Sequence, residues 1–80
     1  MTFDFIVNDI LLFVSIEDKE YLMQHSEKDL IRLHHSFGRN IRNKYKLWET
    51  PLDDIKYKDK HPDDISMDII KAVWSKFENE

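Results

Sequence analysis

Apolar residues recur at every third or fourth position along most of this chain, the spacing of an α-helix with one buried face. The pattern first appears in residues 3–14, where four residues share a face: Phe3, Val7, Ile10 and Val14. We expect a helix there, although the apolar run 11–14 leaves a short strand as the alternative. Ser15 is expected to cap a second, short helix that ends near Met23.

A longer apolar series predicts a continuous helix over residues 27–46, with Ser26 as its N-cap. Its apolar arc contains Leu30, Leu33, His34, Phe37, Ile41, Tyr45 and Trp48. Gly38, the only glycine, lies at the edge of this arc. Glycine within a helix costs about 1 kcal/mol relative to alanine. We therefore expect close packing at Gly38, by an aromatic ring or another helix.

Two further helix starts are predicted in the last third of the chain, because each has a proline followed by acidic residues. Thr50-Pro51 begins a short helix or turn that continues through Tyr57. His61-Pro62-Asp63-Asp64 begins the last helix, which ends near Phe77. The expected buried face of the last helix consists of Ile69, Ile70, Val73, Trp74 and Phe77.

These elements predict an all-α fold, a compact single domain over residues 1–80 with four to five helices around a long central helix. One glycine and two prolines supply few turns for β-hairpins, while 41% hydrophobic residues suffice for a packed core. Without cysteine the chain has neither disulfides nor thiolate metal ligands. The apolar run 10–14 is too short to span a bilayer and follows two acidic residues, so we expect a cytoplasmic protein without an export signal.

Two motifs in the second half of the chain resemble a family of short bacterial and phage proteins of unknown function. The first motif runs from His34 to Trp48 and reads H-x-x-F-G-R-x-I-R-N-x-x-x-L-W. The second, from His61 to Ser66, reads H-P-D-D-x-S. The resemblance implies a small helical fold of bacterial or phage origin, and it implies no activity or cofactor. The motif residues expected to matter for structure are His34, Gly38, Arg42, Asn43, Trp48, His61, Pro62, Asp63, Asp64 and Ser66.

Charge is distributed unevenly along the chain. The net charge is −4, yet residues 26–48 carry +4 between two segments of −4 each. On a continuous helix, six basic residues at steps of three and four align along one side: Lys28, Arg32, His35, Arg39, Arg42 and Lys46. This stripe is a candidate docking site for another protein with an acidic surface. The alternatives are a solvated face neutralised by the chain's own acids, or binding of nucleic-acid phosphates, which the negative net charge disfavours.

The titratable residues do not form a catalytic pattern. His34, His35 and His61, with Asp63 and Asp64, are ligand types for a divalent metal, but adjacent histidines on a helix point about 100° apart. Asp63 and Asp64 fit better as acids at a helix start. We expect no catalytic residue, metal or cofactor. The sequence favours a noncatalytic protein-interaction module of inhibitor, immunity or adaptor type. The alternatives are a nucleic-acid-associated regulator and, more weakly, a metal-dependent hydrolase.

Arg42 and Asn43 have a more specific expected role. We predict that they tie the end of the long helix to the His61–Asp64 turn, with Asp64 slightly favoured over Asp63 as the carboxylate partner. Recognition of a ligand carboxylate by the arginine fork is the alternative.

Overall fold

The chain begins with two α-helices, and the second has the predicted cap, Ser15. In a computed structural model, which describes residues 1–79, α1 spans Phe3–Phe13 and α2 spans Ile16–Met23. Thr2 Oγ1 accepts a hydrogen bond from the Phe5 amide, and Ser15 Oγ accepts one from the Asp18 amide, each at 3.1 Å. These bonds satisfy amides that have no partner within the first turn of a helix. The alternative of a strand over 11–14 is wrong.

The predicted continuous α-helix over 27–46 is also wrong, because this stretch consists of three segments with different helical pitch. A 3₁₀ helix, η1 (Glu27–Leu33), is followed by a π-helical turn, η2 (His34–Gly38), and by the α-helix α3 (Arg39–Lys44). At Ser26 the hydroxyl donates to the Asp29 carboxylate at 2.9 Å, so it does not cap the backbone of η1. A π-turn is wider than an α-turn and changes the direction of the side chains that follow it.

After α3 the chain forms a long connection, and of the short helix or turn predicted from Thr50-Pro51 through Tyr57 it contains one helical turn near the end. Lys46 has a φ of 52°, a left-handed conformation that ends the helix. The only helical turn in this connection is η3 (Ile55–Tyr57). Asp54, one of the acids expected to favour the helix start, instead accepts a hydrogen bond from the Phe3 amide at 2.6 Å. A hydrogen bond therefore joins the connection to the start of α1.

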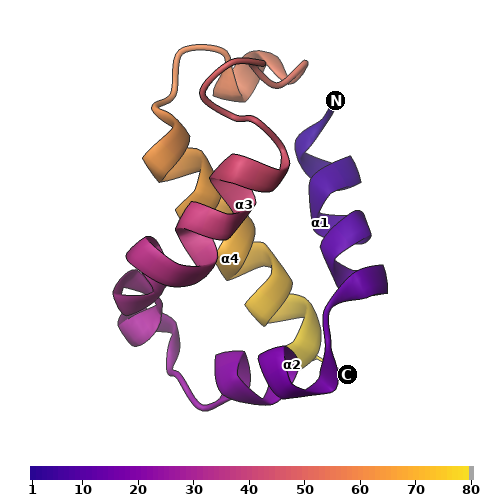
Figure 1. Cartoon of the computed structure of the whole chain (residues 1–80), viewed down its shortest axis with the longest axis vertical. Helices are drawn as coiled ribbons and strands as arrows, with labels where there is room; N and C mark the ends of the chain where they lie inside the picture. Colours follow the sequence, from indigo (N-terminus) through magenta and orange to yellow (C-terminus); the bar gives the residue numbers. More distant parts are fainter. Residues whose placement is uncertain (80) are drawn as a thin grey trace.

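The last helix, α4 (Pro62–Glu78), passes through the middle of the molecule and is contacted by every longer element (Figure 1). In Figure 1 α3 lies in front of α4, α1 runs along one side, and α2 closes the lower end. The inner face of α4 is buried as predicted, except that Trp74 is only half-buried. The core residues are Ile6, Val7, Leu22, Leu30, Leu33, Ile41, Tyr45, Leu47, Leu52, Tyr57, Ile65, Ile69, Ile70, Val73 and Phe77.

The all-α prediction is confirmed, since the elements of residues 1–79 are all helices. The prediction that Trp48 lies on the buried arc is wrong, because this residue is 58% exposed. It lies beyond the end of α3, where the left-handed Lys46 has broken the helical phase. None of the helices in residues 1–79 is long and apolar enough to cross a membrane.

Candidate functional site

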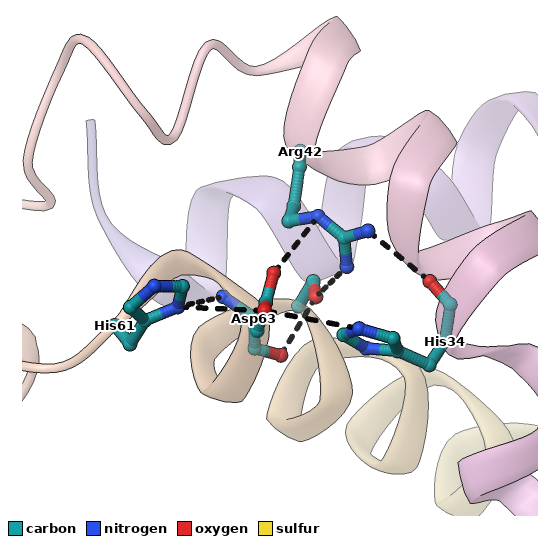
Figure 2. Close-up of polar contacts among 5 residues, drawn as sticks. His34, Arg42, His61 and Asp63 are labelled. Carbon is teal, nitrogen blue, oxygen red and sulfur yellow. Dashed lines mark hydrogen bonds and ion pairs between the residues drawn. The ribbon is translucent and has the colours of Figure 1, made fainter.

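The two sequence motifs meet at the side chain of Arg42. Arg42 lies on α3, and its guanidinium extends toward the first turn of α4 (Figure 2). Its Nε lies 3.3 Å from Asp63 Oδ1, one terminal nitrogen donates to Ser66 Oγ at 3.0 Å, and the other donates to the His34 carbonyl at 3.2 Å. The side chain is only 8% exposed. A buried guanidinium is stable only when its charge and its N–H donors are matched, and here each nitrogen has a partner.

Asp63 is held in place by the start of α4. The ring of His61, the N-cap residue, accepts a hydrogen bond from the Asp63 amide at 3.1 Å through Nδ1. Ser66 Oγ donates to the Asp63 carbonyl at 2.9 Å, so the serine both donates within α4 and accepts from Arg42. Figure 2 shows the His34 and His61 rings on either side of Asp63. Their nearest nitrogens lie 3.8 Å and 3.6 Å from the carboxylate.

Gly38 leaves the space that the guanidinium occupies. A Cβ atom at this position would lie 2.9 Å from a terminal nitrogen of Arg42 and 3.5 Å from both Ser66 Oγ and the Leu33 carbonyl oxygen. The close packing predicted at Gly38 is therefore present. The nearest group is the Arg42 guanidinium, and the expected second helix, α4, also approaches through Ser66; no aromatic ring is among the three nearest groups. Because three bonds hold the guanidinium, it cannot move aside without losing some of them.

The predicted tie between Arg42 and the His61–Asp64 turn is present, with Asp63 as the partner. The slight preference for Asp64 is wrong. Asp64 is exposed, whereas Asp63 faces the interior on the first turn of α4. Asn43 does not share in the tie: it is exposed and makes no side-chain hydrogen bond within residues 1–79. Since each guanidinium nitrogen of Arg42 has a partner within the protein and the residue is buried, we assign this arrangement a structural role.

The remaining motif histidines and Trp48 border this network. His34 was expected in the core, but its ring is half-buried, and His35 is exposed beside it with ring centroids 4.8 Å apart. The Trp48 ring packs edge-on against His61 at 5.0 Å. Pro62 occupies the first position of α4, as predicted. Within residues 1–79, no three His, Cys, Asp or Glu side chains form a group that suits a metal ion.

The structure changes the predicted basic stripe in two respects. Its residues lie on segments of different pitch, because η1 is a 3₁₀ helix and η2 a π-helical turn, so the steps of three and four do not correspond to α-helical turns there. Arg42 is buried and leaves the set. Five members stay exposed, and we call them the cationic surface: Lys28, Arg32, His35, Arg39 and Lys46. None of them forms an ion pair within the described part of the chain.

Several acids of the chain pair with lysines outside the predicted stripe. Asp9 contacts Lys44 at 3.8 Å, and Lys60 and Lys71 pair with Asp68 and Glu27 at 2.9 Å and 3.0 Å. Neutralisation by the chain's own acids, the alternative expected for the stripe, applies to one of its members, Arg42, through Asp63. Within residues 1–79 it does not apply to the cationic surface through direct ion pairs.

A second polar contact, which the sequence did not predict, joins α1 to the end of α3. The Tyr45 hydroxyl donates to the Asp9 carboxylate at 2.5 Å. Burial of the phenol, together with this bond and the negative charge of Asp9, raises the pKa of Tyr45 far above its usual value. Beside this contact lies an open groove of about 180 Å³ between α1 and α3, with Ile10, Phe13, Phe37 and Ile41 among its walls. In the sequence, this contact is indicated only by the position of Asp9, a carboxylate inside an apolar stretch.

A family described as "Domain of unknown function (DUF6794)" matches residues 7–77. The chain belongs to this family. The match includes both motifs and also covers α2 and most of α1, which lie before the motifs. The expected membership in a family of unknown function is thereby confirmed. No match to the chain is found among curated proteins or solved structures.

Proposed function

We propose that this domain is a noncatalytic protein-interaction module, and that its cationic surface binds an acidic surface of a partner protein in the cytoplasm. One observation supports the proposal: four fully ionised side chains project from one segment without an ion pair in residues 1–79. They are Lys28, Arg32, Arg39 and Lys46. Arg42, another basic residue of that segment, is buried and has a structural role, so it is not part of this surface.

The distribution of these charges favours a protein partner over nucleic acid. The chain as a whole carries −4, and a negative molecule is repelled by the dense phosphates of a duplex. An acidic protein surface has a lower charge density, so local complementarity at one surface is sufficient to steer association. An inhibitor, immunity or adaptor role agrees with a small domain in which the buried Arg42 is held by internal bonds while other basic residues are exposed.

The test compares two charge reversals of equal size. Arg32→Glu combined with Arg39→Glu alters the cationic surface, and Lys58→Glu combined with Lys76→Glu alters exposed lysines elsewhere that also lack an ion pair within residues 1–79. Partners captured from the native host with the wild-type domain should be lost with the first variant and kept with the second. Dissociation constants at low and moderate salt then quantify the loss.

We expect the first reversal to weaken binding of the captured partner at least tenfold at low salt, and less at high salt, because charge attraction between exposed groups is screened. Equal affinity of both variants for that partner would refute the proposed surface. Recovery of nucleic acid in place of protein, with binding that falls steeply with salt, would support the regulator alternative instead.

A further inference from the structure

Helix α1 is apolar on nearly every side but packs on only one side. All of its residues except Asp4, Asn8 and Asp9 are apolar. A helix that is hydrophobic all round is normally buried on all sides. In this fold α1 packs against α4 through Ile6 and Val7, and its outer side has no covering element within residues 1–79 (Figure 1).

The uncovered side presents large apolar side chains. Phe5, Leu12 and Phe13 are 56%, 77% and 72% exposed, and Ile16, the first residue of α2, is 76% exposed. At roughly 200 Å² for a large side chain, these four expose on the order of 500 Å² of apolar surface. The largest apolar patch on a typical monomer is about 300–600 Å², and this domain has only 80 residues. The patch also supplies more than half of the roughly 800 Å² per partner that a stable interface buries.

The order of residues on this side is that of a helix-pairing seam. Phe5, Asn8 and Leu12 are all exposed and follow one another at steps of three and four, which is the heptad spacing of paired helices. A single asparagine among apolar seam residues is a common device that fixes the alignment of two helices. The seam contains no charged side chain, and the adjacent Asp9 is half-buried with Tyr45 and Lys44 as partners, which reduces repulsion between two copies.

The seam is also symmetric about its centre. Phe5 precedes and Leu12 follows the midpoint between Asn8 and Asp9 by the same number of residues. In an antiparallel pair of α1 helices, Phe5 of each copy therefore faces Leu12 of the other, and the two Asn8 side chains meet near the two-fold axis. The two Asp4 carboxylates then lie about 13 Å apart along the helix axis, beyond the screening length of physiological salt. A parallel pair would bring them together.

We propose that the domain forms a two-fold symmetric dimer in which α1 pairs antiparallel with α1 of a second copy. The contact covers Phe5, Leu12 and the adjacent Ile16, with Phe13 at its edge. This interface is distinct from the cationic surface, which lies on η1, η2, α3 and the turn after it. A dimer therefore carries two cationic surfaces, and it binds more tightly than a monomer to any partner that has two acidic sites.

The first test measures mass in solution. Sedimentation velocity over a hundredfold range of protein concentration should show the wild type moving from 9.8 kDa toward twice that mass. Leu12→Glu should remain monomeric throughout. The matched control Ile31→Glu replaces an apolar residue that is 64% exposed on η1, on the opposite side of the molecule, and should dimerise as the wild type does (Figure 1). Circular dichroism establishes that each variant is folded.

The second test uses the absence of cysteine and determines the direction of the pair. Asn8→Cys should cross-link to a covalent dimer on mild oxidation, because the two sulfurs meet near the axis. Leu12→Cys alone should not cross-link, since its two copies lie about 10 Å apart along the helix axis. An equal mixture of Phe5→Cys and Leu12→Cys should give the mixed dimer. Lys28→Cys, exposed on η1, is the control for random collision.

Three outcomes would overturn the dimer. They are a wild type that stays monomeric at every concentration, a dimer that survives Leu12→Glu, and an Asn8→Cys variant that cross-links no faster than Lys28→Cys. The first of these would assign the exposed side of α1 to a different protein. Cross-linking by Leu12→Cys alone would replace the antiparallel pair by a parallel one. If Leu12→Glu fails to fold, the cysteine variants decide the question.

Discussion

The Arg42 network and the outer side of α1 break the usual distribution of residues in opposite ways. At Arg42 a charged side chain is buried, and on α1 large apolar side chains are exposed. A buried charge and an exposed apolar patch are the two departures from the inside–outside rule that carry information. Here they differ in whether the molecule itself supplies what the side chains need. Arg42 has a carboxylate, a hydroxyl and a carbonyl within reach, whereas Phe5 and Leu12 on α1 remain 56% and 77% exposed.

This difference separates structural residues from residues available for binding. The motif residues around Arg42 are matched to one another, so their replacement should primarily affect folding. The outer side of α1 and the cationic surface are unmatched, so their replacement should primarily affect association. The following predictions test that division by measuring the free energy of unfolding, at one fixed protein concentration because any dimer would contribute to stability.

The largest effect is expected for Arg42→Ala. It removes a nearly buried side chain and leaves Ser66 Oγ, the His34 carbonyl and Asp63 without their donor, at a cost of about 3 kcal/mol. Arg39→Ala, on the exposed side of the same helix, should change stability by less than about 0.5 kcal/mol. Urea denaturation compares the two. Equal effects would mean that the network does not stabilise the fold.

The same measurement distinguishes the two candidate carboxylates. A double-mutant cycle of Arg42→Ala with Asp63→Ala should give a coupling energy of about 1 kcal/mol or more, because Asp63 is half-buried and contacts Nε. The cycle with Asp64→Ala should give less than about 0.5 kcal/mol. Stronger coupling to Asp64 would mean that Asp64, and not Asp63, is the acid that pairs with Arg42.

Gly38→Ala should destabilise the domain by about 1–2 kcal/mol, although alanine has the better helix propensity. The new Cβ would lie 2.9 Å from an Arg42 nitrogen, and the guanidinium must shift and weaken its bonds. In the Arg42→Ala background that conflict is absent. There, Gly38→Ala should be neutral or stabilising by up to about 1 kcal/mol. A loss of equal size in both backgrounds would show that the backbone, and not the guanidinium, excludes a side chain.

The bond between Tyr45 and Asp9 connects the α3 region to α1, and it should add about 1 kcal/mol to stability at neutral pH. Because folding raises the pKa of Tyr45 above its usual 10.0, this contribution is complete below pH 10 and is lost as the pH rises further. Tyr45→Phe should therefore be less stable than the wild type at pH 7, and the difference should shrink above pH 10. In the wild type, tyrosine absorbance should show one of the three tyrosines ionising only with alkaline unfolding.

Sequence periodicity was sufficient to predict three of the helices. α1, α2 and α4 have a cap residue and an apolar face each, and both signals are local. The contact between the two motifs was also predictable, because an arginine near the end of the predicted helix can pair with one of the two carboxylates of the second motif. The choice between Asp63 and Asp64 was not, since it depends on how α4 is rotated toward α3.

The 27–46 stretch shows where periodicity fails. Residues spaced by three and four fit an α-helix, but the sum of a 3₁₀ segment and a π-turn preserves nearly the same average spacing. The change of pitch is set by packing against α4 and by the guanidinium that donates to the His34 carbonyl, and neither is local in sequence. In residues 3–14, by contrast, the predicted face packs against the core, and Phe5 and Leu12, which lie outside that face, are exposed.

The smallest effect is expected for Trp48→Ala, although this residue closes the first motif. The Trp48 ring is 58% exposed and touches His61 only by its edge. Its loss should cost less than about 1 kcal/mol, because an exposed edge-to-face contact buries little area. Trp74 is the internal reference. It is half-buried against the core and its indole N–H donates to the His25 carbonyl at 3.0 Å, so Trp74→Ala should cost about 3 kcal/mol. If urea denaturation gave Trp48→Ala the larger loss, the ring would have to be covered in solution. Trp48 would then belong with the residues that are available for binding, and not with the motif residues that stabilise the fold.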